Sequence, residues 1–251
     1  MPCLFCGATD RKMSNEHLWP RWIGELVPPE VRDTPVSYTF ETHKGEVRKF
    51  STTLFELKVK DVCKPCNETW MSRYETNAQR WMTGMLQGRG RELHSTGQTQ
   101  IAAWAVLKCL IGQRLYMDDP LVPAEHYKQI YDLRDDARPP PRPQVFTARA
   151  GWSQDAAPPG LFRVNGIGLR TDPSFPEPES VRGYMATFSV MDVVLQVFWP
   201  YDASPDGNFE HPTGYLPSLR RIWPVSDSFT WPPGPTLTGV GIAGLAGPEP
   251  R

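Results

Sequence analysis

Two Cys-x-x-Cys pairs constrain what this chain can fold into more than any other feature of the sequence. Cys3 and Cys6 form the first pair, and Cys63 and Cys66 form the second, with 56 residues between them. Each pair can place two thiolates on one ion, and four thiolates complete a closed tetrahedral site that is structural. The spacing therefore predicts one structural zinc ion shared by two distant segments. Redox-active pairs and plain buried cysteines are the alternatives.

The remaining composition favours a soluble protein in a reduced compartment. Cys109 stands alone in an apolar segment, so the five cysteines fit a reducing environment better than an extracellular disulfide framework. No run approaches the roughly 18 apolar residues that a membrane span needs, and residues 1–10 lack the basic and apolar regions of a secretory signal. We expect a cytoplasmic protein with no membrane partner.

The first half of the chain predicts strands followed by helices. Residues 36–60 carry β-branched and aromatic side chains around a His-Lys-Gly turn, which predicts a hairpin and a further strand. From Asn67 onward the apolar positions recur at helical spacing until Gly-Arg-Gly at 88–90 ends the pattern. Residues 101–116 predict a buried helix, and Pro123 is placed to begin another.

The second half predicts antiparallel strands. A proline-rich connector at 135–144 leads into strand-like runs at 145–152, 160–169 and 183–200. The tail from Trp231 is rich in Gly and Pro, so we expect it to be largely irregular. A chain of 251 residues can hold one large domain or two small ones, and we favour two. We predict an α+β protein divided into 1–95 and 96–251.

A Glu-His pair and an asparagine stand in a fixed relation to the cysteine pairs. Glu16 and His17 lie between the pairs, with Pro20 three residues on, and Asn67 follows the second pair and opens the predicted helix. With the four cysteines, the stretches "EHLWPRW" and "VCKPCNETWMSRYE" resemble the HNH endonuclease family, in particular its bacterial and phage branch. The resemblance covers about the first 85 residues.

This resemblance implies a zinc-stapled ββα-metal module in which two strands and a helix hold a divalent ion beside a scissile phosphate. His17 would be the general base, because a neutral imidazole can accept a proton from water at physiological pH. Glu16 and the side-chain oxygen of Asn67 would hold Mg²⁺ or Mn²⁺, which prefer oxygen ligands. The implied activity is metal-dependent hydrolysis of phosphodiester bonds in DNA, with RNA as the alternative substrate.

Other charged residues are candidates for a role because they lie near the motif in the sequence. Arg21, Lys64 and Arg73 lie near enough to contact phosphates, and a plain surface role is the alternative for each. Glu75 comes eight residues after Asn67, on nearly the same helix face, where it could approach the metal through water, and we favour the alternative of a solvated carboxylate.

Two features keep other functions open. HNH proteins usually have a central asparagine shortly before the second cysteine pair, but this chain has none between Asn15 and Asn67. The formal net charge of -1 also argues against a surface coated in positive charge for nucleic acid. A second hypothesis is therefore a catalytically impaired, zinc-stapled module that binds nucleic acid or protein. A third is that the accessory region 96–251, whose role no motif indicates, carries the main activity.

Overall fold

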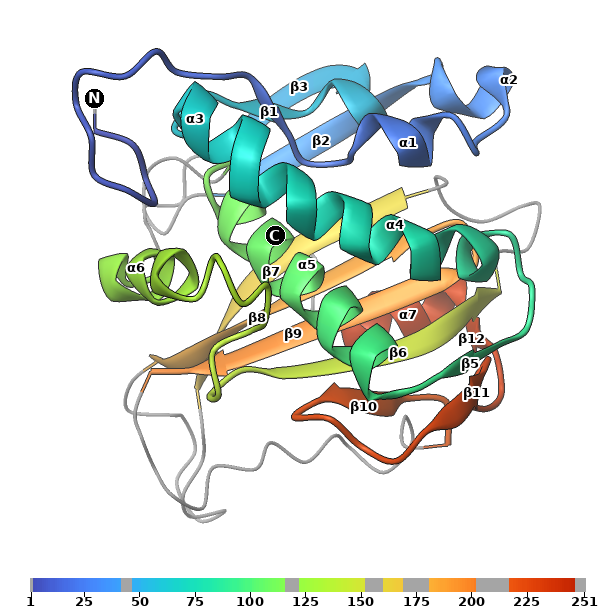
Figure 1. Ribbon diagram of the computed structural model, residues 1–251. Helices are drawn as coiled ribbons and strands as arrows, with labels where there is room; N and C mark the ends of the chain where they lie inside the picture. Colours follow the sequence, from blue (N-terminus) through green and yellow to red (C-terminus); the bar gives the residue numbers. More distant parts are fainter. Residues whose placement is uncertain are drawn as a thin grey trace.

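The computed structural model describes residues 2–41, 47–115, 122–151, 160–168, 181–201 and 217–246. Helices and mainly antiparallel strands form a mixed α+β fold, as the sequence predicts. The layers are stacked, with the N-terminal segments at one end, helices in the middle and a sheet below them (Figure 1).

The sheet is antiparallel in the order β10-β6-β9-β8-β7, and the short β12 adds to β6 in parallel. Its strands are β6 (Gln144–Gly151), β7 (Gly160–Gly168), β8 (Val181–Val190), β9 (Val193–Pro200), β10 (Arg220–Trp223) and β12 (Leu237–Thr238). The three predicted strand runs are confirmed. The run at 183–200 is split into β8 and β9 by a tight turn, in which Met191 adopts a positive φ of 48°.

Helix α5 (Ser95–Gln113) crosses one face of this sheet, and α4 (Ser72–Leu86) packs on α5 (Figure 1). Every residue of α5 from Ile101 to Gln113 is buried, because the helix has neighbours on both sides. Helix α6 (Ala124–Asp132) lies in the same layer, and Pro123 is its N-cap. The predicted buried helix and the helix start at Pro123 are therefore confirmed. The opposite face of the sheet packs against α7 (Gly239–Leu245).

The N-terminal segments supply two small antiparallel sheets. The predicted hairpin is confirmed as β2 (Pro35–Glu41) with β3 (Val47–Thr53), and its predicted turn at 43–45 lies outside the described residues. The predicted further strand is β4 (Lys58–Val59), which pairs with β1 (Glu16–His17). Short helices complete this part, namely α1 (Arg21–Gly24), α2 (Pro29–Arg32) and a 3-10 turn at Leu54–Glu56.

The helix that follows the second cysteine pair begins at α3 (Lys64–Cys66), passes through a π-helical turn at Asn67–Met71 and continues as α4. The predicted helix from Asn67 is confirmed, and helical structure starts three residues earlier. Gly88 lies just beyond the end of α4 with a φ of +71°, a conformation that glycine adopts without steric cost.

One continuous core cluster contains the cysteine pairs, α4, α5 and the α5-facing side of the sheet. The predicted boundary falls at Ser95, the first residue of α5, just after strand β5 (Arg91–Leu93), which pairs with β11 (Phe229–Trp231). The division into 1–95 and 96–251 stays a prediction.

The segment from Trp231 is more ordered than its composition indicates. It forms β12 and α7 because Leu237, Ile242 and Leu245 are buried against the sheet. Removing their apolar surface from water stabilises the ordered segment. In the described ranges, no helix combines the length and the apolar character needed to cross a bilayer.

Candidate metal centre and adjacent polar cluster

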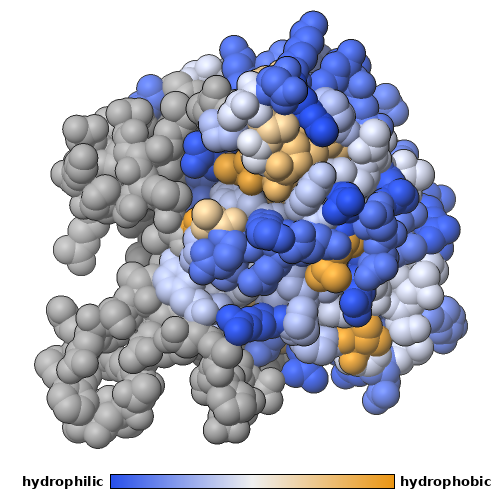
Figure 2. All heavy atoms as spheres, turned by 60° about the vertical axis from the view of Figure 1, so that its left-hand side comes forward, coloured by the Kyte–Doolittle hydropathy of each residue, from blue (hydrophilic) through white to orange (hydrophobic). Residues whose placement is uncertain are grey.

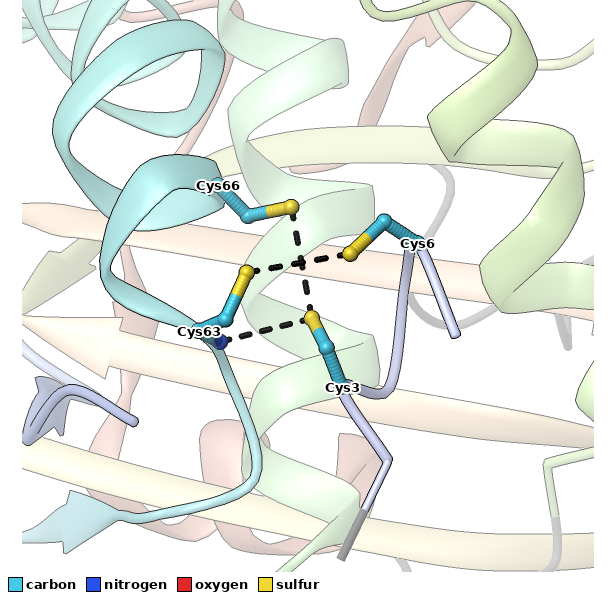
Figure 3. A group of neighbouring side chains, drawn as sticks. All are labelled: Cys3, Cys6, Cys63 and Cys66. Atoms are coloured by element: carbon cyan, nitrogen blue, oxygen red, sulfur yellow. Dashed lines mark hydrogen bonds between the residues drawn. The ribbon is translucent and has the colours of Figure 1, made fainter. Parts of the chain in front are cut away.

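The four paired cysteines meet at one point, as Figure 3 shows. Their sulfur atoms all lie within 4.8 Å of one another. The Sγ atoms of Cys3 and Cys66 are 4.0 Å apart, and those of Cys6 and Cys63 are 3.7 Å apart. Four thiolates at about 2.3 Å from a tetrahedral zinc ion would be about 3.8 Å apart. The cluster therefore could hold a metal ion such as zinc.

Local backbone structure places each pair. After the first pair the chain turns back, with the Gly7 amide donating to the Cys3 carbonyl at 2.9 Å and Gly7 at a φ of +71°. At the second pair, Cys63 caps α3, and its amide donates to the Cys3 sulfur at 3.3 Å. Amide donation of this kind stabilises a thiolate. The two segments are thus joined by backbone as well as by the sulfur cluster.

The thiols influence one another's ionisation. The hydrogen bond between them lowers the pKa of Cys3 and raises the pKa of Cys66, so the two do not ionise together without a counter-charge. A bound zinc ion supplies that charge and deprotonates its thiol ligands. None of the five cysteines forms a disulfide.

Glu16 and Asn67, which the sequence places 51 residues apart, lie close together. Glu16 lies in β1 and is only 5% exposed, and the Asn67 side chain, at the start of the π-helical turn, lowers the pKa of its carboxyl. Burial raises the pKa of Glu16, while the neighbouring Lys108 acts in the opposite direction.

A lysine from α5 occupies the centre of this polar cluster. The Nζ of Lys108 lies 2.7 Å from Glu16 Oε1, 2.7 Å from Glu75 Oε1 and 2.9 Å from the carbonyl oxygen of His17. The lysine side chain is 1% exposed, and the Glu75 side chain is 27% exposed. An oxygen-lined point that already holds a cationic group has the donor chemistry that Mg²⁺ and Mn²⁺ prefer. Glu16, Glu75 and Asn67 are the side chains that could hold such an ion.

His17 is half-buried and lies beside positive charge. It directly follows Glu16 in β1. Burial lowers the pKa of His17, and the charges of Lys58 and Arg21 lower it further, against the smaller opposite effect of Glu56. Lys58 stands directly opposite His17 in the β1–β4 pair, in the interval where HNH proteins usually have the central asparagine.

The predicted phosphate contacts differ in their positions. Arg21 is exposed at the start of α1, close enough to His17 to affect its pKa. Lys64 is exposed beside the second cysteine pair and forms an ion pair with Glu68 at 3.3 Å. Arg73 donates to the carbonyl of Arg134 at 2.8 Å, so it contacts the segment after α6.

Sequence reasoning missed Lys108 and favoured the wrong alternative for Glu75. Glu75 was expected to be solvated, but its carboxylate contacts a buried ammonium. A signal for Lys108 was present, because it is the single charged residue in the apolar run from Ile101 to Gly112. A buried lysine needs an anionic partner, although the sequence alone does not identify which carboxylate supplies it.

Comparison with models of known protein families, with curated proteins and with solved structures gives no match for this chain. The resemblance to HNH proteins therefore rests on the motif residues and on the geometry described above.

Proposed function

We propose that this chain is an HNH-type, metal-dependent endonuclease that hydrolyses phosphodiester bonds in DNA. The observation that carries the proposal is the proximity of Glu16 and Asn67, with His17 next to Glu16 in the same strand. An acidic residue, an adjacent imidazole and a helix-borne amide are the groups that metal-assisted phosphodiester hydrolysis needs. The four-cysteine cluster would join residues 3–6 to the start of this helix, and β1 is held by its pairing with β4.

His17 acts as the general base in this proposal. Because burial and nearby cations lower its pKa, the imidazole is neutral at physiological pH and can accept a proton from water. Lys58 and Arg21, both exposed, place positive charge beside it and would attract the phosphate backbone.

The divalent ion, Mg²⁺ or Mn²⁺, would neutralise charge on the phosphoryl oxygens and the leaving group. Glu16 would hold the ion through its carboxylate, and Asn67 would hold it through its side-chain oxygen. The Asn67 side chain also lowers the pKa of Glu16, which favours the ionised carboxylate that a cation binds.

The character of the surface also favours a polar partner. Among the described residues, the face seen in Figure 2 is mostly hydrophilic, with only small and separate apolar patches. A contiguous apolar surface, which would indicate a protein-docking site, is not seen among these residues on this face.

The second candidate is a zinc-stapled binding module that has lost efficient catalysis. Two observations favour it: the ammonium of Lys108 lies between Glu16 and Glu75, and Lys58 stands opposite His17 without a nearby asparagine. Such a module would bind nucleic acid through Arg21 and Lys58 and would leave it intact.

A plasmid assay separates the two candidates. The zinc-loaded full chain is incubated with supercoiled DNA and Mg²⁺ or Mn²⁺, alongside His17→Ala and the matched control His94→Ala. His94 is exposed and contacts Ser228 and Glu92, far from the motif in sequence. The endonuclease proposal expects nicking by the native chain and by the His94 variant, and none by the His17 variant. Retarded but uncut DNA, unaffected by His17→Ala, would refute it and favour the second candidate.

A further inference from the structure

Lys108 is an internal cation inserted between two carboxylates of the proposed active site. It belongs to α5, outside the part of the chain that resembles HNH proteins, and no HNH motif position includes it. Its three short contacts to Glu16, Glu75 and the His17 carbonyl use all three N–H donors of the ammonium. The ammonium therefore lies at the centre of this group of oxygen atoms.

The charge of the cluster favours a cation that carries more positive charge than the single charge of lysine. Two carboxylates face one ammonium, so a net negative charge remains when both are ionised. A divalent ion at the same point would neutralise both. Protein oxygens bind Mg²⁺ and the similar Mn²⁺ at a little over about 2 Å, and these oxygens already lie 2.7 to 2.9 Å from Nζ, so a small contraction would complete the contacts.

We propose that the Lys108 ammonium occupies the position of the divalent ion, that Glu75 is a further ligand of that ion, and that lysine and metal compete for the site. The identity of the site rests on the proposed function. The lysine stem has four flexible carbons, so its head can withdraw without unfolding α5. Lys108 thereby sets how much free Mg²⁺ or Mn²⁺ is needed to load the site.

A purely structural ion pair is the competing explanation. In that case, removing the lysine charge would leave two carboxylates with no affinity for metal. The two explanations differ in what happens to metal binding when the ammonium is replaced by a neutral group, and this can be measured without any nuclease assay.

The test measures Mn²⁺ binding to the zinc-loaded full chain by electron paramagnetic resonance of the free ion. The variants are Lys108→Gln, which keeps a polar group, and the control Lys128→Gln, which removes an exposed lysine paired with Asp132. We expect Lys108→Gln to bind one Mn²⁺ at least about tenfold more tightly than the native chain, and Lys128→Gln to match the native chain. Adding Glu75→Gln to Lys108→Gln should remove the gain.

An unchanged or weaker Mn²⁺ affinity in Lys108→Gln would overturn the proposal, as would a gain that survives the Glu75 substitution. If Lys108→Gln unfolds without metal, Mn²⁺ should restore a cooperative thermal transition, because ligand binding stabilises the folded state. Failure of Mn²⁺ to restore that transition would also overturn the proposal.

The plasmid assay keeps this inference separate from the proposed function. Tight Mn²⁺ binding by Lys108→Gln, with no cleavage by any variant, would support competition at the site and refute the endonuclease. Suppose instead that the native chain cleaves DNA in a way that depends on His17, and that removing Lys108 gives no gain in Mn²⁺ affinity. This result would support the endonuclease and refute competition at the site.

Discussion

Replacing Lys108 with methionine tests how much stability the buried ion cluster contributes. Removing one partner of a buried ion pair typically costs about 3–5 kcal/mol, because a charge is left buried without compensation. Two features of the cluster favour the lower value. Burial raises the pKa of Glu16, so this carboxyl can take up a proton in the variant, and the Glu75 side chain is 27% exposed and can contact water. We expect a loss of about 3 kcal/mol at pH 7.

The assay is urea and thermal unfolding of the zinc-loaded chain without added divalent ion. For a chain of this size, a loss of about 3 kcal/mol corresponds to a fall in Tm of roughly 6–12 °C. Lys128→Met, at an exposed ion pair, should change stability by less than about 0.5 kcal/mol. A loss below about 1 kcal/mol in Lys108→Met would refute the reasoning, since it would mean that the carboxylates do not need the ammonium.

Three further outcomes are expected. Removing zinc with a strong chelator, or substituting Cys63→Ser, should abolish the cooperative unfolding transition of the N-terminal part in circular dichroism, because binding energy at such a site is folding energy. Burial lowers the pKa of His126 to about 4, so the unfolded chain takes up the proton first as the pH falls. The free energy of unfolding should therefore decrease between pH 6.5 and 4 by at most about 3 kcal/mol, and His126→Phe should flatten that part of the urea-midpoint profile. Gly88→Ala should destabilise the chain by about 1–2 kcal/mol in the same unfolding assay, because φ is positive there and the new Cβ would lie 2.8 Å from a carboxylate oxygen of Asp192.

Local patterns predicted much of the fold. The hairpin β2–β3, the helix from Asn67 and the buried character of α5 each follow from side-chain periodicity over a short window, which acts within the element itself. The meeting of the two cysteine pairs was also predictable, because two Cys-x-x-Cys pairs can bind one metal ion together.

Contacts between distant segments could not be predicted in this way. Glu16 and Lys108 are 92 residues apart, and nothing local to either residue identifies the other. The order of the tail has the same origin, because β12 and α7 form only against a sheet built from earlier strands. Tertiary packing determines both the Glu16–Lys108 contact and the order of the tail.

The pairing of β5 with β11 has a consequence for how the chain folds during synthesis. Among the described residues, 91–93 pair with 229–231, so a long loop must close before this pairing can form. On the ribosome, Arg91–Leu93 would emerge well before their partner strand is synthesised. A nascent polypeptide would thus carry an unpaired strand edge through most of its translation, and a stop codon shortly before residue 229 would leave that edge permanently open to aggregation.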